Sequence, residues 1–332
     1  MIEVSLFILS FFIIFIIDKF KLKISTYTKL IDKPDQIRKF HKDETPLLGG
    51  VMIFIPFFLS NLYLILSQKS DDISLIILLM SACCFLIGLI DDIKNIAYRY
   101  KFILLIIIFY FFLFLNPELQ IDKIYFSSNN KIYSIDKFGI HFTVLCLLLL
   151  INALNLIDGV DGLCIMTSFI IMIWLMFFFK NFAITNSIIL ISLIYIFILN
   201  IKKKIFLGDS GSLLIGSIIS LKLILYYNMS STEIFLPVES IFIALMLPGL
   251  DMLRVFSVRI YNKKNPFLGD RNHLHHLLIE KNVRNNLLLF IFFLLISIPI
   301  FLDLFLKLDH LSVIILFIII YFLLVFFLKK KT

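Results

Sequence analysis

The stretch VLCLLLLINALNLIDGVDGL, residues 144–163, places four polar side chains directly after an unbroken apolar run. These side chains, Asn152, Asn155, Asp158 and Asp161, follow one another at intervals of three residues, and a second apolar run begins at once. Apolar runs of this kind predict helices that cross a membrane. The stretch therefore predicts two membrane spans joined by a short turn that carries amides and carboxylates.

The intervals of three do not place the four side chains on one helix face. In an α-helix each step of three residues turns by about 300°, so the four positions drift by about 180° in all. Two glycines in the stretch favour a helix end near Asp158. We therefore expect Asn152 and Asn155 in the last turns of the first helix, and Asp158 and Asp161 in the loop and the start of the next helix.

The composition of the whole chain indicates an integral membrane protein. Its 332 residues are 61% hydrophobic and only 16% charged, and the mean hydropathy is +1.02. A soluble domain carries about a quarter charged residues. The chain is therefore predicted to be all-α, a single polytopic membrane domain over residues 1–332 with about eleven transmembrane helices. The apolar runs lie at 2–18, 47–66, 73–90, 102–115, 141–157, 163–179, 182–199, 211–228, 235–253, 287–306 and 311–328.

Lysine and arginine residues predict the orientation of these helices. With the N-terminus outside and the C-terminus in the cytoplasm, the inner loops and the C-terminal tail hold 24 Lys or Arg residues and the outer loops hold 6. The net charge of +8 fits a cytoplasmic face that meets anionic lipid or a phosphate-bearing substrate. The basic residues form no long soluble stripe, so nucleic acid is not an expected partner. The inner loops are 18–46, 91–101, 155–162, 200–210 and 254–286.

Four of these inner loops carry polar motifs. Besides the stretch quoted above, GLIDDIKN supplies Asp91 and Asp92, FLGDSGS supplies Asp209, and GDRNHLHH supplies three histidines within four residues. Each motif also has a structural interpretation, as a solvated helix end, a turn with a serine cap, or an interfacial cluster. Together they bring carboxylates, amides, glycines and histidines to one membrane face, which favours a site built from helix ends.

The residue types indicate phosphate chemistry with a divalent cation. Carboxylate and amide oxygens without thiolates favour Mg²⁺, with Mn²⁺ as the alternative. Basic residues and glycine-rich turns suit a bound diphosphate. The residues alone therefore predict a membrane enzyme that acts on a diphosphate at the cytoplasmic face.

The same motifs resemble, in order and through nearly the whole chain, those of the polyprenyl-phosphate N-acetylhexosamine-1-phosphate transferase family, glycosyltransferase family 4. The segment DKPDQIRKFHKDETPLLGGV (32–51) resembles the first inner loop of that family, and PGLDMLRVFSVRIYNKKNPFLGDRNHLHHLL resembles its last. GLIDDIKN is similar to its aspartate pair, and NALNLIDGVDGL and FLGDSGS to its third and fourth motifs. The His-Leu-His-His form resembles the undecaprenyl-phosphate GlcNAc-1-phosphate transferase branch. Leu268-Gly269 departs from that branch, which usually has a proline before the aspartate, and this departure bears on the sugar.

This resemblance implies transfer of a sugar-1-phosphate, by default N-acetylglucosamine-1-phosphate, from a UDP-sugar to undecaprenyl phosphate, with release of UMP. The reaction would initiate a cell-envelope polysaccharide. The resemblance also implies Mg²⁺ as cofactor, a multi-pass location in the inner (cytoplasmic) membrane, and a homodimer. The sequence leaves open GalNAc, FucNAc or QuiNAc as the sugar, and from other classes a secondary transporter or a non-catalytic membrane scaffold.

Residue roles follow from the same resemblance. Asn155 and Asp209 match the Mg²⁺ ligands of the family. Asp91 matches the residue proposed to act as a base on the lipid phosphate, and Asp92 matches its partner. Further implied positions are two near the nucleotide, Asp158 and Asp161, the aromatic on the uracil, Phe206, and the diphosphate-binding residues Lys101, Arg271, His273, His275 and His276.

Some charged residues lie within apolar runs. Asp251 and Arg254, three residues apart, are expected to pair on one helix face. Lys222 lies inside the eighth span, where snorkelling and a contact within the protein are both open.

Overall fold

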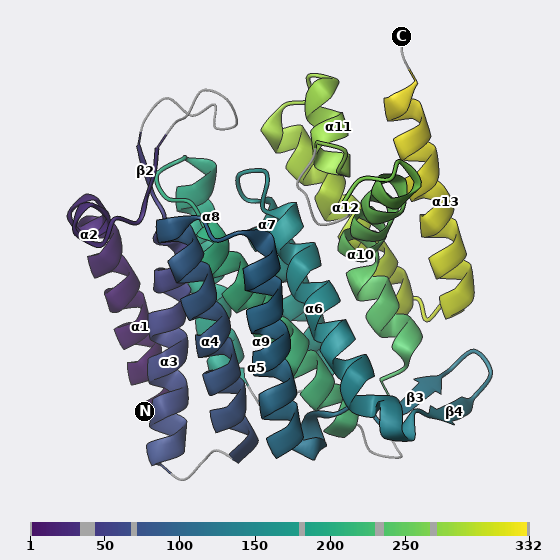
Figure 1. Ribbon diagram of the computed structural model, residues 1–332, viewed down its shortest axis with the longest axis horizontal. Helices are drawn as coiled ribbons and strands as arrows, with labels where there is room; N and C mark the ends of the chain where they lie inside the picture. Colours follow the sequence, from purple (N-terminus) through teal and green to yellow (C-terminus); the bar gives the residue numbers. More distant parts are fainter. Residues whose placement is uncertain are drawn as a thin grey trace.

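The protein is a bundle of long helices that run roughly side by side (Figure 1). The structure is a computed structural model, and it describes residues 2–33, 44–67, 72–178, 183–229, 236–265 and 271–330. Within these residues the only sheets are two antiparallel pairs of short strands, β1 with β2 and β3 with β4.

The elements follow one another along the chain with two 3₁₀ turns among them. They are α1 Ile2–Lys19, α2 Lys21–Thr28, β1 Ile31–Asp32, β2 Thr45–Pro46, α3 Gly49–Leu66, α4 Asp72–Lys94, α5 Tyr98–Leu115, η1 Pro117–Leu119, β3 Lys123–Phe126, β4 Lys131–Ser134, η2 Asp136–Phe138, α6 Gly139–Ile157, α7 Leu163–Phe178, α8 Ala183–Ile201, α9 Gly208–Met229, α10 Val238–Tyr261, α11 Leu274–Glu280, α12 Asn285–Leu304 and α13 His310–Lys329.

Every apolar run of the sequence corresponds to a helix. Among the described residues, nine helices are long and apolar enough to cross a membrane, and α7 is a shorter apolar helix. Tyr98 and Tyr100 extend α5 beyond its apolar run, since that helix begins at Tyr98. The prediction of an all-α, multi-pass membrane protein is therefore confirmed, while the number of crossings and their orientation stay predictions.

The polar segments contain structure that the sequence analysis did not predict. Helix α10 continues to Tyr261, well past the predicted span end at residue 253, and α11 follows in the same segment. The polar segment 116–140 contains the hairpin β3–β4. Helix α9 begins at Gly208, so Asp209 lies in its first turn and not before the helix, as the apolar pattern suggested.

Helix α9 forms the centre of the bundle. It packs against α3, α4 and α6, and nearly all of its residues from Ser210 to Tyr226 are buried. Gly88 of α4 lies against the backbone of Asp209 and Ser210. Small residues let helix backbones approach closely inside a membrane. The first turn of α9 is therefore fixed tightly against α4.

The two ends of the bundle differ in structure. Strands β1 and β2 and helices α2 and α11 lie at one end, the upper end in Figure 1, and the hairpin β3–β4 lies at the opposite end. Helix α1 begins at the hairpin end, whereas α13 ends at the upper end. The turns that follow α4, α6 and α8 also lie at the upper end (Figure 1). The polar motifs of the sequence therefore meet at one end, as predicted.

The hairpin β3–β4 is fastened to the helices beside it by side-chain hydrogen bonds. The carboxylate of Glu239, in the first turn of α10, accepts the backbone N–H groups of Ser127 (3.1 Å) and Ser128 (2.9 Å). The Nδ1 atom of His310 in α13 lies 2.9 Å from the Ser127 hydroxyl. These contacts tie the first turn of α10 to the hairpin end of the bundle.

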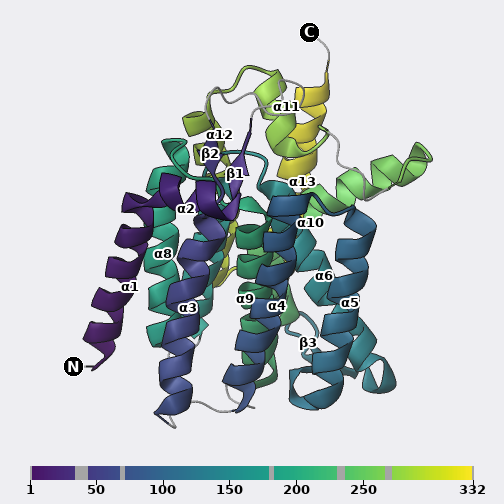
Figure 2. The same cartoon turned by 60° about the vertical axis from the view of Figure 1, so that its left-hand side comes forward.

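Helix α10 changes direction along its length. It contains Pro248, which lacks an N–H donor and commonly kinks a helix. Figure 2 shows the second half of α10 running sideways, away from the neighbouring helices. Asp251 and Arg254 follow Pro248 in this second half, and Arg254 contacts Asn272 in the segment that precedes α11.

The two helical glycines Gly88 and Gly249 form a matched pair for a test of this packing. A β-carbon on Gly88 would overlap the backbone of Asp209, whereas one on Gly249 meets nothing within 4 Å. We expect Gly88→Ala to lower stability by about 1–3 kcal/mol, because overpacking displaces neighbouring atoms. Gly249→Ala should leave stability unchanged or raise it by up to about 1 kcal/mol through helix propensity. Thermal unfolding of the detergent-solubilised variants measures both, and equal midpoints would contradict the close α4–α9 approach.

Candidate active site

A cavity of about 610 Å³ lies at the upper end of the bundle. Five segments line it: residues near β1, the end of α4, the turn after α6, the end of α8, and the segment that leads into α9. The structure thus brings distant motifs to one cavity. The residues singled out in the sequence that line it are Asp91, Asp92, Asp158, Asp161, Phe206 and Asp209.

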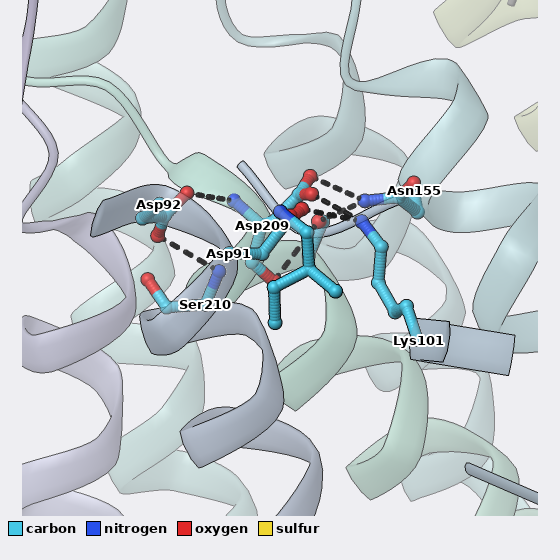
Figure 3. A network of polar contacts seen from close by, with 8 residues as sticks. Asp91, Asp92, Lys101, Asn155, Asp209 and Ser210 are labelled. Carbon is cyan, nitrogen blue, oxygen red and sulfur yellow. Dashed lines mark hydrogen bonds and ion pairs between the residues drawn. The ribbon is translucent and has the colours of Figure 1, made fainter. Parts of the chain in front are cut away.

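Two carboxylates of the cavity share one ammonium group. The Nζ atom of Lys101 lies 2.6 Å from Oδ2 of Asp91 and 2.5 Å from Oδ2 of Asp209. Figure 3 shows the lysine reaching from α5 to the place where these carboxylates meet. The other oxygen of Asp91 accepts the backbone N–H of Ile96 at 2.6 Å. Both oxygens of Asp91 therefore face donors, and Lys101 offsets the repulsion between the two acids.

Asn155 and Asp209, the predicted metal ligands, lie side by side. The amide nitrogen of Asn155 donates to Oδ1 of Asp209 and to the hydroxyl of Ser212, each at 2.8 Å. Each oxygen of the Asp209 carboxylate thus has its own donor, Asn155 for Oδ1 and Lys101 for Oδ2, and the two donor nitrogens lie next to each other (Figure 3).

The oxygen atoms of this cluster suit a hard divalent cation. Asp91 and Asp209 direct one oxygen each to the same point, where the Lys101 ammonium lies. In the described part of the chain no group of three or more His, Cys, Asp or Glu side chains is arranged to hold a metal ion. Mg²⁺ is commonly held by one or two carboxylates together with substrate phosphates and water. The residues therefore fit a cation that binds with a phosphate substrate.

Asp92 holds the start of α9. Its two carboxylate oxygens accept the backbone N–H groups of Asp209 (2.8 Å) and Ser210 (3.0 Å). Gly208 has a φ of +74°, and a β-carbon there would lie 2.7 Å from an Asp92 oxygen. Negative charge at a helix N-terminus is favourable because the first N–H groups have no partner within the helix. Asp92 therefore caps α9 from a neighbouring helix and fixes Asp209.

The opening stretch of the sequence divides as its spacing predicts. Helix α6 ends at Ile157, and the Asp158 N–H bonds the carbonyl of Asn155. The amide nitrogen of Asn152 donates a hydrogen bond to the backbone carbonyl of Leu148 at 2.7 Å. Asp158 and Asp161 lie in the turn before α7, and both line the cavity. The prediction of a helix end near Asp158 is therefore confirmed.

The carboxyl of Asp158 is in an unusual electrostatic environment. Burial raises its pKa well above the ordinary range, and the nearby charges of Asp209, Asp92 and Asp161 act in the same direction. A carboxyl in this environment keeps its proton to a higher pH than an exposed aspartate, because burial and like charges disfavour the ionised form.

Asn200 at the end of α8 joins two turns that line the cavity, and the sequence analysis missed it. Its Oδ1 accepts the N–H of Gly162 at 2.5 Å, and its amide nitrogen donates to the carbonyl of Ile205 at 2.9 Å. Gly162 has a φ of +84°, which favours glycine. A lone asparagine beside a run of lysines gives no motif, so only the folded chain reveals this link.

The histidines lie deeper than the sequence suggested. His273 and His275 are buried, and His276 is half-buried with its ring centroid 4.1 Å from that of His275. A β-carbon on Gly159 would lie 2.7 Å from Nε2 of His275, so this ring packs against the turn that lines the cavity. Arg271 is exposed, and the preceding residues 266–270 lie outside the described residues.

His275 predicts a pH dependence of stability. Burial first, and then the charge of His276, lower its pKa from 6.5 to about 3. The unfolded chain takes up a proton as the pH falls through 6.5, while the folded chain does not, so acid favours unfolding. Between pH 6.5 and pH 5 this amounts to at most about 2 kcal/mol. We expect a fall in thermal midpoint over this range that is smaller in His275→Gln, and an identical fall in both proteins would refute the assignment.

Comparison with known proteins gives a consistent result. Residues 74–236 match the model of glycosyl transferase family 4. An undecaprenyl-phosphate alpha-N-acetylglucosaminyl 1-phosphate transferase of Thermotoga maritima is 28% identical over 281 residues, which cover 82% of this chain and 80% of the relative.

Proteins with the same name give similar values in other bacteria. The one from Salmonella typhi is 27% identical over 296 residues, 83% of this chain and 75% of the relative. The one from Escherichia coli K12 is 27% identical over 277 residues, 79% of this chain and 72% of the relative. The chain is thus similar to glycosyl transferase family 4 over residues 74–236 and to sugar-1-phosphate transferases over about four fifths of its length, and with the cavity of carboxylates at the helix ends these matches indicate a sugar-phosphate transferase.

Proposed function

We propose that this enzyme transfers N-acetylglucosamine-1-phosphate from UDP-N-acetylglucosamine to undecaprenyl phosphate, with UMP as the second product. The observation that carries the proposal is the pairing of Lys101 with Asp91 and Asp209, two carboxylates that line one polar cavity of a membrane protein. The names of the relatives supply the lipid and the sugar. We place the reaction at the cytoplasmic face of the inner membrane, because the basic loops lie on the side of the cavity.

The proposed reaction joins two anions. A phosphate oxygen of undecaprenyl phosphate attacks the β-phosphorus of the UDP-sugar, the bond from that phosphorus to the bridging oxygen breaks, and UMP leaves with the electron pair. Positive groups are needed to bring the reactants together and to stabilise the developing charge. Lys101 lies inside the cavity network, and we assign it to the diphosphate together with Arg271 and His273, His275 and His276.

We assign a divalent cation, Mg²⁺ with Mn²⁺ as the alternative, to Asn155 and Asp209. When bound, it would neutralise charge on the diphosphate and on the departing UMP oxygen. The two side chains are neighbours, and Asn155, whose amide nitrogen donates to Asp209 in the structure, would turn its amide oxygen to the cation. Lys101 balances Asp209 in the structure and can turn towards a phosphate when a cation takes over that task.

We propose that Asp91 acts by placing charge and not by removing a proton. The second pKa of a phosphate monoester is about 6, so the lipid phosphate is mostly a dianion at neutral pH. Both oxygens of Asp91 already accept hydrogen bonds, from Ile96 and from Lys101. Its main proposed task is to hold the Lys101 ammonium at the cavity.

Asp92, Asp158, Asp161 and Phe206 complete the proposed site. Asp92 would keep Asp209 in place through the first turn of α9, and Asp158 and Asp161 would lie near the nucleotide. Phe206, two residues before Gly208, lines the cavity and is assigned to the uracil ring. GalNAc, FucNAc or QuiNAc could replace GlcNAc as the transferred sugar without any change in the reaction class. The homodimer is an expectation from the resemblance.

Release of UMP tests the reaction directly. We expect detergent-purified protein with Mg²⁺ and undecaprenyl phosphate to release UMP from UDP-GlcNAc, and chelation of the cation to stop it. Asp209→Asn should lower kcat by at least about 100-fold, because it removes charge from the centre of the network. Folding of the variant is checked by its elution profile and thermal midpoint.

The control for this experiment is Asp136→Asn, an exposed aspartate beside the hairpin at the opposite end of the bundle. It should keep wild-type activity. If another UDP-sugar releases UMP and UDP-GlcNAc does not, that UDP-sugar is the donor and the proposed reaction class stands. No release from UDP-GlcNAc, UDP-GalNAc, UDP-FucNAc or UDP-QuiNAc would refute the proposed reaction, and solute uptake by proteoliposomes would then favour a transporter.

The pH profile of Asp91→Asn separates the two roles of this residue. If Asp91 places charge, the variant should lose a similar factor in kcat at pH 6.5 and at pH 9. If Asp91 removes a proton from the lipid phosphate, activity should return at pH 9, where the phosphate is ionised without help. Recovery at pH 9 would therefore overturn the electrostatic role.

A further inference from the structure

A buried carboxylate outside the cavity gathers four hydrogen bonds from three parts of the chain. Oδ1 of Asp251, in the second half of α10, accepts from Arg254 at 2.8 Å, from the Tyr321 hydroxyl at 2.8 Å and from the backbone N–H of Leu274 at 3.0 Å. Its Oδ2 lies 2.8 Å from Nδ1 of His273. The expected pairing of Asp251 with Arg254 is confirmed, and it is one part of a larger cluster.

Arg254 and Tyr321 complete this cluster. The Nε atom of Arg254 donates to the Tyr321 hydroxyl at 2.6 Å, and an Nη atom donates to the carbonyl of Asn272 at 2.6 Å. Asp251, Arg254, His273 and Tyr321 are all buried. Removal of one partner from a buried, hydrogen-bonded charge pair leaves the other charge uncompensated and is strongly destabilising. The Tyr321 hydroxyl therefore joins α13 to Asp251 and Arg254 of α10, and these two side chains in turn hold the entry to α11.

The cluster determines where α11 begins. The bonded atoms of Asn272, His273 and Leu274 span the entry to that helix, and its first residue is Leu274. The next residue, His275, packs against Gly159 in the turn that lines the cavity. Neither Asp251 nor Tyr321 lines the cavity itself. Their effect on the site therefore passes through the position of the histidines.

We infer that Asp251 and Tyr321 are positioning residues, which hold the His273–His276 segment against the Asp158–Asp161 turn so that its histidines meet the diphosphate. The functional part of this inference rests on the proposed function. The geometric part does not, because it concerns only where α11 is held. Misplacement of a binding group by about 1 Å can lower the rate by about 100-fold, so a distant hydroxyl can matter for turnover.

Tyr321→Phe tests the inference, because it removes one hydroxyl and keeps the ring. The matched control is Tyr226→Phe on α9, another buried tyrosine, whose hydroxyl accepts from Asn186 at 3.1 Å far from the histidines. Hydrogen–deuterium exchange of residues 271–280 reports on the position of α11 without any substrate. The Leu274 N–H is the direct reporter, since Asp251 is its acceptor.

We expect faster exchange at residues 271–280 in Tyr321→Phe and in Asp251→Asn, and wild-type exchange there in Tyr226→Phe. Unchanged exchange in both cluster variants, or the same increase in the control, would overturn the geometric part. The exchange measurement needs no substrate, so it tests the geometric part even if no UDP-sugar releases UMP. A failure of the geometric part can therefore be told apart from a failure of the proposed function.

The kinetic measurement decides the functional part. Tyr321→Phe should lower kcat/KM for the UDP-sugar by about 10- to 100-fold, with the KM for undecaprenyl phosphate unchanged. If the cluster had a purely structural role, Tyr321→Phe would lower the yield of folded protein, but it would not lower kcat/KM for the UDP-sugar while leaving the KM for undecaprenyl phosphate unchanged. Tyr226→Phe shows how much loss of a buried tyrosine hydroxyl lowers the yield by itself. Faster exchange at α11 with wild-type kcat/KM would overturn the role of the cluster in catalysis.

Discussion

The first turn of α9 depends on one arrangement of charges. Lys101 lies between Asp91 and Asp209, while Asp92 accepts the N–H groups of Asp209 and Ser210. Carboxylates this close repel one another unless cations or N–H donors compensate. Because α9 is the central helix, this compensation also fixes how α4 and α5 meet it. The geometry of the cavity follows from a balance of charge as much as from apolar packing.

Much of the architecture was predictable because its signals are local. A run of apolar residues is sufficient to predict a span, and Gly159 and Gly162 marked the end of α6 correctly. The gathering of Asp91, Asp158 and Asp209 followed from the alternation of the helices. The partners of these side chains did not, because Asn200 and Tyr321 act across long stretches of sequence and belong to no motif. The hairpin β3–β4 also escaped prediction, since its strands have only four residues each and none of these is buried.

The aspartates of this protein divide into two kinds according to what they hold. Asp92 and Asp251 accept backbone N–H groups and thereby fix the starts of α9 and α11. Asp91 and Asp209 instead share the ammonium of Lys101 at the cavity. Replacement of either kind is expected to stop turnover, so loss of activity alone does not identify a reacting group. Amide exchange at the starts of α9 and α11 separates the two kinds, because Asp92 and Asp251 accept the N–H groups there, whereas Asp91 accepts only the N–H of Ile96 between α4 and α5.

Helix α10 is pinned at two points on either side of its bend. Glu239 anchors its first turn to the hairpin, and Asp251 anchors its second half to α13 and to the entry of α11. Pro248 lies between the anchors. Contacts on both sides of Pro248 therefore oppose a shift of α10 along its axis. The hairpin at the opposite end of the bundle thus fixes one end of the helix whose other end positions the histidine segment.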